Sequence, residues 1–337
     1  MSTTAPPRVL PTLTLSERLV CYVILGTLCG VYHIALFGFP SLVYLAYTSK
    51  PVSNFGVAFR VVLGVLVVIS VVPINHRPQF WFLRLKVWKL LNKYFGYETD
   101  LANITGKNKL DLKEKYLFWE APHGIWPLGQ LLSASYIPDI TGVPFEEKMV
   151  CGTGASIVFL FPIIRHVFSW LGTHTASRGS FTKIFKNNNW AAVVAGGVAE
   201  MYMGSGTTEG IYVKRRFGTV KMCLQEGAHI VPSFFFGNTK AFHLIGGDSD
   251  SSLFSRVLQT LSRTLKMSIV IFSGVGGLPI PMRVPLKMTA GRVIKVKQND
   301  NPSNEEVQAV LDQVVAEFER LYKEQKPEWE TRPLVIT

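Results

Sequence analysis

Apolar positions dominate two stretches near the start of the chain. No charged residue occurs from Leu19 to Tyr47, and a shorter apolar stretch runs from Val61 to Ile74. A helix that crosses a bilayer needs about 20 apolar residues. The pattern therefore predicts a transmembrane hairpin over residues 18–75, which either crosses or re-enters the bilayer. A cleavable signal peptide is the alternative for the first stretch, but such a peptide has an apolar core of only about 7 to 15 residues.

The residues after this hairpin alternate with helical spacing. Over residues 78–95, four large apolar side chains share one helical face and three lysines share another (Trp81, Leu85, Trp88 and Phe95; Lys86, Lys89 and Lys93). This predicts an amphipathic helix at the membrane interface over residues 76–98. A core helix with a lysine edge is the alternative. Basic residues crowd this side of the hairpin, whereas its loop carries only Lys50 and the nearby Arg60, so we expect both termini to be cytosolic.

Beyond residue 99 the pattern changes to short apolar runs separated by longer helical ones. The expected strands are 116–119, 191–195, 230–236, 268–272 and 287–296, and the expected helices are 156–171, 218–225 and 304–325. Alternation of this kind predicts one α/β domain over residues 99–337, a sheet with flanking helices. Residues 1–17 contain several prolines and few apolar residues, which is typical of a disordered tail.

Composition and charge narrow the partners. Hydrophobic residues make up 48% of the chain, and 35 Lys and Arg against 23 Asp and Glu give a net charge of +12. This excess suits an anionic phospholipid surface or a phosphate-bearing ligand, and nucleic acid is the less favoured partner. Four widely spaced cysteines form no C-x-x-C pair, which disfavours a disulfide framework or a zinc site (Cys21, Cys29, Cys151 and Cys223).

The first candidate for chemistry is a histidine directly after an expected strand, within Ala121-Pro122-His123-Gly124. The end of a strand in an open α/β sheet is the usual place for a reactive group. Pro122 restricts the approach to the histidine, and Gly124 allows a substrate close to the backbone. The pKa of imidazole suits a general base near neutral pH. A histidine that merely caps a turn is the alternative.

Two further segments carry candidate binding groups. Gly196 and Gly197 follow the expected strand 191–195, and Glu200 just beyond them can orient an imidazole or hold a polar headgroup. The alternative is a plain turn with a solvated glutamate. The basic run 214–216 precedes Gly218 and Lys221 at the start of an expected helix. Cations beside helix N-terminal amides favour phosphate, although a solvated charge run is equally compatible.

Several common signatures do not occur. Gly154-Ala155-Ser156 lacks the closing glycine of a G-x-S-x-G nucleophile elbow, and Gly152-Thr153-Gly154 lacks the third glycine of a dinucleotide fingerprint. No phosphate-binding G-x-x-x-x-G-K-[ST] loop is found, and the histidine spacings predict no metal centre. The sequence therefore disfavours a serine hydrolase and a nucleotide-dependent enzyme, and we expect no metal.

A series of short motifs, in a fixed order, extends over residues 55–330. They are Pro122-His123-Gly124, Trp170-Leu171-Gly172, Ala176-Ser177-Arg178, Gly196-Gly197 with Glu200, Arg216-Phe217-Gly218 with Lys221, Gly227 with Val231-Pro232, Phe236-Gly237, Pro279-Ile280-Pro281 and Gly291-Arg292-Val293-Ile294. In this order they resemble the type 2 diacylglycerol acyltransferase family, especially its plant and algal branch. Phe82-Leu83-Arg84-Leu85 is similar to the neutral-lipid-binding element proposed for that family, although Lys89 stands where a nonpolar residue is usual.

The resemblance implies a glycerolipid-acyltransferase-like fold and transfer of a fatty acyl group from acyl-CoA to diacylglycerol, without a cofactor. His123 and Glu200 are then the catalytic residues, and the substrate-binding residues are Pro122, Gly124, Arg178, Gly196, Gly197, Arg216, Gly218, Lys221, Phe82, Leu83 and Leu85. It also implies a membrane of the endoplasmic reticulum with a cytosolic catalytic face, a lipid-droplet location as a variant, membrane lipids as partners, and a homo-oligomer as one option.

Two departures from the family's pattern leave alternatives open. Ala121 stands where many members have histidine or glutamate, and Leu128 stands where related glycerolipid acyltransferases have an aspartate. Any acid that orients the histidine must then come from elsewhere, and Glu200 is our candidate. The alternatives are a monoacylglycerol acyltransferase, a wax ester synthase and a catalytically silent lipid-binding protein.

Overall fold

The computed structural model describes residues 9–50, 53–162, 164–203, 206–245 and 270–337, together with residues 253, 256, 257 and 260. In this part of the chain the centre is a seven-stranded sheet, in which β10 runs antiparallel to its neighbour β7 and every strand from β7 to β4 runs parallel to the next. Its spatial order is β1 (Glu98–Asp100), β10 (Lys287–Ala290), β7 (His229–Phe236), β2 (Tyr116–Ala121), β5 (Trp190–Val193), β3 (Val150–Gly154) and β4 (His174–Thr175). The predicted α/β class is confirmed.

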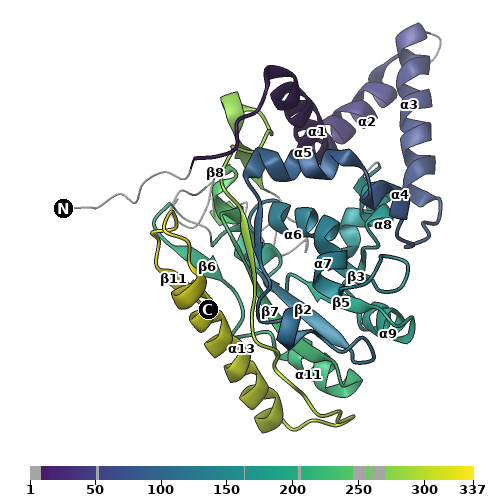
Figure 1. Ribbon diagram of the computed structural model, residues 1–337. Helices are drawn as coiled ribbons and strands as arrows, with labels where there is room; N and C mark the ends of the chain where they lie inside the picture. Colours follow the sequence, from purple (N-terminus) through teal and green to yellow (C-terminus); the bar gives the residue numbers. More distant parts are fainter. Residues whose placement is uncertain are drawn as a thin grey trace.

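Helices and two small strand pairs surround this sheet (Figure 1). The helices are α1 (Leu15–His33), α2 (Phe39–Thr48), α3 (Asn54–Val71), α4 (Phe80–Leu83), α5 (Lys86–Phe95), α6 (Leu128–Ser133), α7 (Ile137–Thr141), α8 (Ile164–Trp170), α9 (Arg178–Lys186), α10 (Val198–Met201), α11 (Phe217–Glu226) and α13 (Asn304–Gln325). A π-helical turn, Ile34–Gly38, joins α1 to α2. The strand pairs are β6 (Glu209–Ile211) with β11 (Leu334–Ile336) and β8 (His243–Ile245) with β9 (Ile271–Ser273).

The central strand β7 shows how the two faces of the sheet are covered. Successive side chains of a strand point to opposite faces. Phe234 and Phe236 pack against Tyr322 of α13, with ring centroids 5.2 and 5.5 Å away. On the opposite face, Phe235 lies so close to Gly129 of α6 that an added Cβ there would be 2.7 Å from its ring. The largely apolar sequence of β7 therefore reflects burial on both faces.

The strongest predicted elements agree with the structure. Helix α13 has the predicted bounds, and the hydroxyl of Ser303 accepts the N–H of Glu306 in a capping box. The predicted helix 156–171 is wrong as one element, because it is a 3₁₀ turn at Ser156–Leu160 followed by α8. Pro162 lies between the two and cannot donate a helical hydrogen bond. The strand predicted over 268–272 begins outside the described residues, and β9 forms at Ile271–Ser273.

The start of the chain is more ordered than predicted. The side chain of Thr14 caps α1, so the helix begins at Leu15, inside the segment predicted to be a disordered tail. Leu10 and Pro11 contact Gly96, and the main-chain oxygen of Pro11 accepts a hydrogen bond from Arg283. The contacts of Leu10 and Pro11 and the cap at Thr14 therefore order this part of the tail, although most of its residues stay exposed, and this corrects the prediction for it. Residues 1–8 lie outside the described residues.

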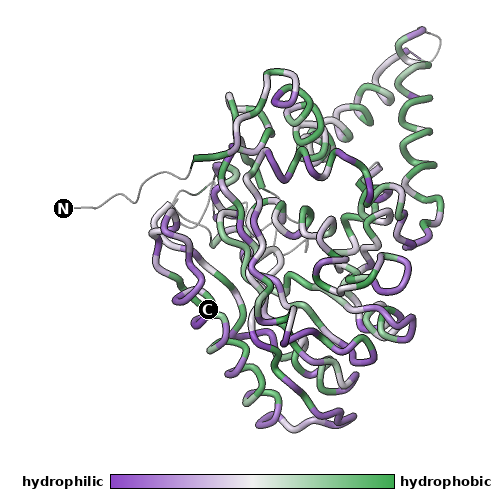
Figure 2. Tube along the Cα trace, in the orientation of Figure 1, coloured by the Kyte–Doolittle hydropathy of each residue, from purple (hydrophilic) through white to green (hydrophobic). Residues whose placement is uncertain are grey.

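The apolar stretches form helices of two kinds. Both α1 and α3 are long and apolar enough to cross a membrane. Cys21, Leu25 and Cys29 of α1 are at most 1% exposed because they pack into the core. Helix α3 stands away from the domain beside α2, and Figure 2 shows it hydrophobic along most of its length. The hairpin that projects from the domain is therefore formed by α2 and α3, whereas α1 lies along the domain.

The single helix predicted over residues 78–95 is wrong. The chain leaves helical geometry at Leu85, and the carbonyl of Phe82 accepts a hydrogen bond of 2.7 Å from the indole N–H of Trp88. Trp88 and Phe95 belong to the core, as in the alternative we gave for this segment, whereas Trp81 remains 56% exposed. The interfacial location of this segment stays a prediction.

Candidate active site

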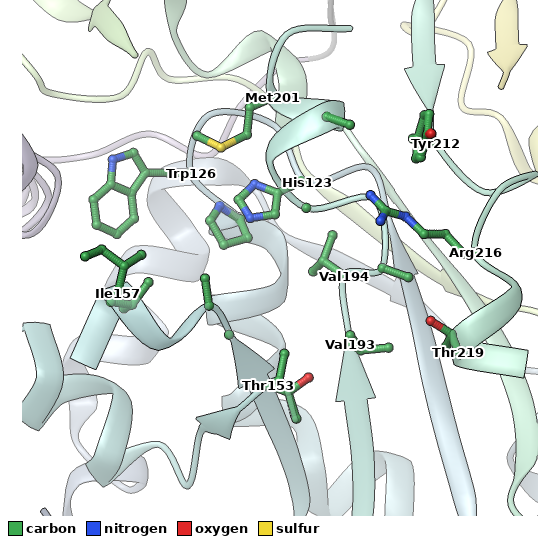
Figure 3. Close-up of a pocket in the computed structure, with 18 of the residues that line it drawn as sticks. His123, Trp126, Thr153, Ile157, Val193, Val194, Met201, Tyr212, Arg216 and Thr219 are labelled. Atoms are coloured by element: carbon green, nitrogen blue, oxygen red, sulfur yellow. The ribbon is translucent and has the colours of Figure 1, made fainter. Parts of the chain in front are cut away.

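A cavity of about 1040 Å³ opens at the carboxyl ends of the parallel strands (Figure 3). Residues at the ends of β3 and β5 line it, and so does His123, which follows β2. This edge is the usual ligand site of an open α/β sheet, as predicted from the position of His123. In Figure 3, Trp126 and Ile157 lie on one side of the imidazole, and Tyr212 and Arg216 lie on the other.

The imidazole of His123 is held in one tautomer. Its Nδ1 lies 2.7 Å from the carbonyl oxygen of Gly124. A carbonyl can only accept, so Nδ1 carries the proton and Nε2 keeps a free lone pair. Burial lowers the pKa of His123, and the hydrogen bond to Gly124 opposes this only in part. The ring is therefore neutral near pH 7 and has the form that a general base requires.

Glu200 touches the histidine segment, but through the main chain. Its Oε2 accepts the N–H of His123 at 2.8 Å, and its Oε1 accepts the N–H of Tyr212 at 2.8 Å. The carboxylate is fully buried, and burial raises the pKa of Glu200 to about 7 against the opposing effect of these two hydrogen bonds and of Arg216. The prediction that Glu200 orients the imidazole directly is therefore corrected, because the carboxylate holds the backbone of His123 and the ring itself bonds the carbonyl of Gly124.

The paired glycines make this contact possible. A Cβ on Gly196 would lie 1.9 Å from the carboxyl carbon of Glu200, so a side chain there would displace the carboxylate. Gly197 has φ 54° and ψ −139°, which is accessible essentially only to glycine. Gly196 and Gly197 therefore form the turn after β5 that brings Glu200 to His123.

The predicted basic residues meet at the same cavity. Arg178, Arg216 and Lys221 all line it, together with Gly218. Arg178 begins α9, and Arg216 directly precedes α11. The guanidinium of Arg216 donates to the carbonyl of Gly196 and stacks 4.6 Å from the ring centroid of Tyr212. Its buried Nε has no hydrogen-bond partner within the described residues. The cavity therefore has a cationic side beside the ends of two helices.

The predicted lipid-binding residues lie elsewhere. Phe82, Leu83 and Leu85 are not among the residues that line the cavity. The ring of Phe82 packs against Trp88 and Trp170, with centroids 5.4 Å away in each case, and Leu83 is 3% exposed. Their place at the substrate site is therefore not supported, because Phe82 and Leu83 are used in packing α4 against the domain.

Pro122 and Gly124 position the histidine rather than line the cavity. The bond between Ala121 and Pro122 is cis, and the carbonyl of Pro122 accepts hydrogen bonds from Gln130 and Asn238. Gly124 has φ 63°, and a Cβ on it would lie 2.9 Å from the main-chain oxygen of Asn238. These two residues therefore fix the path of the chain around His123.

Two groups of residues at the site were not predicted from the sequence. Asn238 is 1% exposed and makes several hydrogen bonds to the segment around His123. Its signal was available, since it directly follows the Phe236-Gly237 motif at the end of an expected strand. The second group is the apolar lining of the cavity, which includes Tyr32, Ile157, Val158, Phe161, Phe168 and Phe272. No local pattern marks these residues, because they come from four separate segments.

The fold and the site define an α/β enzyme in which a partly buried histidine lies between an apolar lining and a cationic side. Comparison with known sequences identifies the class as O-acyltransferases. The chain belongs to the diacylglycerol acyltransferase family, whose sequence model matches residues 55–336. Members of this family transfer acyl groups from acyl-CoA to glycerolipids.

Individual relatives are distant and differ in the acceptor that they are named for. The chain is 28% identical over 240 residues to the mouse acyl-CoA wax alcohol acyltransferase 1, covering 68% of this chain and 70% of that protein. It is 25% identical over 264 residues to diacylglycerol O-acyltransferase 1 of Schizosaccharomyces pombe, covering 75% and 73%. It is 25% identical over 263 residues to the bovine 2-acylglycerol O-acyltransferase 1, covering 74% and 75%.

A looser likeness links the chain to one solved structure. This is the crystal structure of the 1-acyl-sn-glycerophosphate acyltransferase PlsC from Thermotoga maritima, with a TM-score of 0.39 and 11% identity. The overlap covers 92% of this chain and 99% of that chain.

Proposed function

We propose that the protein transfers a fatty acyl group from acyl-CoA to the free hydroxyl of diacylglycerol, forming triacylglycerol and CoA. His123 Nε2 removes the hydroxyl proton while the oxygen attacks the thioester carbonyl. The carbon–sulfur bond then breaks, and the imidazolium returns the proton to the departing thiolate. No acyl-enzyme is formed. Main-chain amides near Gly124 or Gly196 are our candidates for stabilising the oxyanion.

The position of His123 between two unlike sides of one cavity carries this proposal. Acyl-CoA combines three phosphate groups with a long apolar chain, so it needs both a cationic and an apolar surface. Arg178, Arg216 and Lys221 supply the cations beside the N-terminal ends of α9 and α11. The buried, unpartnered Nε of Arg216 is a donor available to a bound anion.

The apolar lining supports a lipid acceptor. Tyr32 reaches the cavity from α1, and Phe272 reaches it from β9. Diacylglycerol is our choice among acceptors because of the family to which the chain belongs. A monoacylglycerol or a long-chain alcohol is the alternative, favoured by the names of the bovine and mouse relatives. The same surfaces would serve either one, so acceptor choice depends on the shape of the apolar side.

The setting of the enzyme is proposed on the same grounds. We place the hairpin of α2 and α3 in the endoplasmic reticulum membrane, with the catalytic domain on the cytosolic side, and lipid droplets are a second location. The long apolar helices support membrane association. A glycerolipid-acyltransferase-like sheet, catalysis without a metal or redox cofactor, and a homo-oligomer remain predictions from the resemblance described above.

The test is substitution of His123 in the purified, detergent-solubilised enzyme. We expect His123→Ala to lower turnover of labelled acyl-CoA with diacylglycerol by about 10²- to 10⁴-fold. The matched control is His243→Ala, since His243 is exposed and does not line the cavity. Near-parent turnover of His123→Ala would overturn the assigned base. Offering diacylglycerol, monoacylglycerol and a fatty alcohol in parallel decides the acceptor, and no product from any of them would support the silent lipid-binding alternative.

The pH profile gives an independent check. Burial lowers the pKa of His123, so its neutral form persists below the ordinary histidine range. We expect protonation of His123 to lower kcat/KM only below about pH 6.5, the ordinary histidine pKa, whereas a change near pH 7 would report Glu200, whose pKa burial raises to about 7. A limb well above that value would contradict a neutral imidazole as the base.

A further inference from the structure

The residue that directly follows Gly237 is buried at the centre of the active-site edge. Asn238 begins a short 3₁₀ turn after β7 and is 1% exposed. β7 pairs in parallel with β2, the strand that precedes His123, so the two strands end side by side. Asn238 has no place in the acyl-transfer steps proposed above, although it lies beside the residue that performs them.

The side-chain amide of Asn238 is fully used. Its Nδ2 donates to the carbonyl of His123 at 2.7 Å, to the carbonyl of Pro122 at 3.1 Å and to Oε1 of Gln130 at 3.1 Å. Its Oδ1 accepts the N–H of Gly129 at 3.0 Å. The carbonyls can only accept and the main-chain N–H can only donate, so the orientation of the amide is unambiguous.

These contacts complete a clamp on the main chain of His123. Its N–H donates to Glu200 Oε2, and its carbonyl accepts from Asn238 Nδ2. Both holding side chains are buried, and they follow opposite neighbours of β2 in the sheet: Glu200 lies in α10 after β5, and Asn238 lies in the 3₁₀ turn after β7. Gly124 allows the close approach, because its missing side chain leaves room for the main chain of Asn238. The imidazole is bonded to the carbonyl of Gly124, so its orientation depends on the main chain that this clamp holds.

We propose that Asn238 is a positioning residue for the base: its amide donors hold the carbonyls of Pro122 and His123, so that the free Nε2 is directed at the acceptor hydroxyl. This inference rests on the proposed role of His123. General-base catalysis requires the base within hydrogen-bond reach of the proton it removes. Loss of the clamp should therefore lower kcat while KM for acyl-CoA stays nearly unchanged, since the cationic side is separate.

The sharpest test is Asn238→Asp. The aspartate keeps the oxygen that accepts the N–H of Gly129. When ionised, its second oxygen replaces the amide donor and faces the two main-chain carbonyls and the Gln130 side-chain oxygen, which repel it. We expect kcat to fall by about 10²-fold at pH 8, with KM for acyl-CoA within threefold of the parent. Protonation of the aspartate restores one donor, so the ratio of variant to parent kcat should rise as the pH is lowered. Asn238→Ala lacks this group, and its ratio should not depend on pH.

The matched control is Asn189→Asp. Within the described part of the chain, the side chain of Asn189 makes a hydrogen bond only through Oδ1, which accepts the N–H of Met149, and aspartate preserves that acceptor. We expect parent-like kcat and no change of the ratio with pH. Thermal unfolding of each purified variant reports whether it is folded at the assay temperature.

The outcomes separate this inference from the proposed function. If His123→Ala is inactive but folded Asn238→Asp has parent-like kcat, or a loss that does not change with pH, the positioning role is wrong and the base assignment stands. If His123→Ala keeps parent activity, the proposed function itself fails. If Asn238→Asp does not fold, Asn238→Ser takes its place, since its hydroxyl retains one donor. A lowered kcat with unchanged KM then supports the clamp, and a parent-like kcat overturns it.

Discussion

Helices α1 and α3 are similar in length, and both are apolar enough to cross a membrane, but they have different surroundings. In the apolar 18-residue stretch of α1, 28% is buried inside the domain, whereas in that of α3 only 6% is buried. Gly26 and Gly30 of α1 face Ile280 and Pro279, where an added Cβ would lie 3.1 and 3.4 Å from the nearest atoms. In α3, Gly64 has no such neighbour within 4 Å.

Apolar length alone therefore does not identify the role of a helix. The small residues Gly26 and Gly30 have the spacing that often marks helix pairing in membranes. Here that groove is occupied by a loop of the same chain, so α1 is a wall of the catalytic domain and brings Tyr32 to the cavity. Helix α3 contributes nothing to the cavity among the described residues and is the better candidate for a purely membrane role.

The largest effect should come from a charge on the packed face of α1. Leu25 is 1% exposed, and we expect Leu25→Asp to destabilise the domain by about 3–5 kcal/mol, because it removes packing and buries a carboxylate. Val65 of α3 is 52% exposed, and Val65→Asp should leave solubilised activity intact while weakening retention in membranes. Thermal unfolding and activity in detergent measure the first effect, and membrane flotation the second. If both variants lost activity equally, the different roles assigned to α1 and α3 would be wrong.

A smaller effect is expected where α3 joins the domain. Arg165 of α8 is 5% exposed and donates to the carbonyls of Ile69 and Val72 at the end of α3. Removing these charge-assisted hydrogen bonds by Arg165→Met should cost about 2–3 kcal/mol. Chemical denaturation measures this, with proteolysis between α3 and α4 as a local readout. Arg77→Met is the control, since Arg77 is exposed and lies in the connection between α3 and α4.

Gly26 of α1 and Gly64 of α3 give the most closely matched comparison between the two helices. Gly26→Leu should overpack the contact with Ile280 and cost about 2 kcal/mol, accompanied by lost activity as α1 shifts. Gly64→Leu meets open space and replaces a poor helix former by a good one, so it should be neutral or slightly stabilising. Melting temperatures of both variants decide this. A Gly26→Leu protein as stable as Gly64→Leu would show that α1 is not seated on the loop.

The smallest effect concerns one hydroxyl. The phenol oxygen of Tyr32 accepts the N–H of Val270 at 3.0 Å, and Tyr32→Phe should cost about 1 kcal/mol. The acyl-chain or acceptor preference should shift modestly, because Tyr32 and Phe272 line the cavity. Tyr47→Phe in α2 is the control, since Tyr47 is 87% exposed. Product profiles with mixed acyl-CoA donors compare the two, and an unchanged Tyr32→Phe profile would remove Tyr32 from substrate selection.

Local patterns determined much of this protein. The apolar periodicity and capping residues of α13, the apolar runs of β2, β5 and β7, and the position of His123 after a strand all follow from neighbouring residues, because such elements satisfy their geometry locally. The glycine pair before Glu200 was also recognisable, since a tight turn requires glycine.

Only the tertiary structure decided which groups meet. Asn238 reaches the carbonyl of His123 across 115 residues, and Glu200 reaches its N–H across 77. Likewise, only folding decided that α1 packs on the domain while α3 stands beside it, since by sequence both helices are long and apolar enough to cross a membrane. The physical reason is that the hydrophobic effect favours removal of apolar side chains from water but does not select the surface that covers them. The hydrogen-bond clamp depends on strand order and register, which are not determined by the residues next to His123 in the sequence.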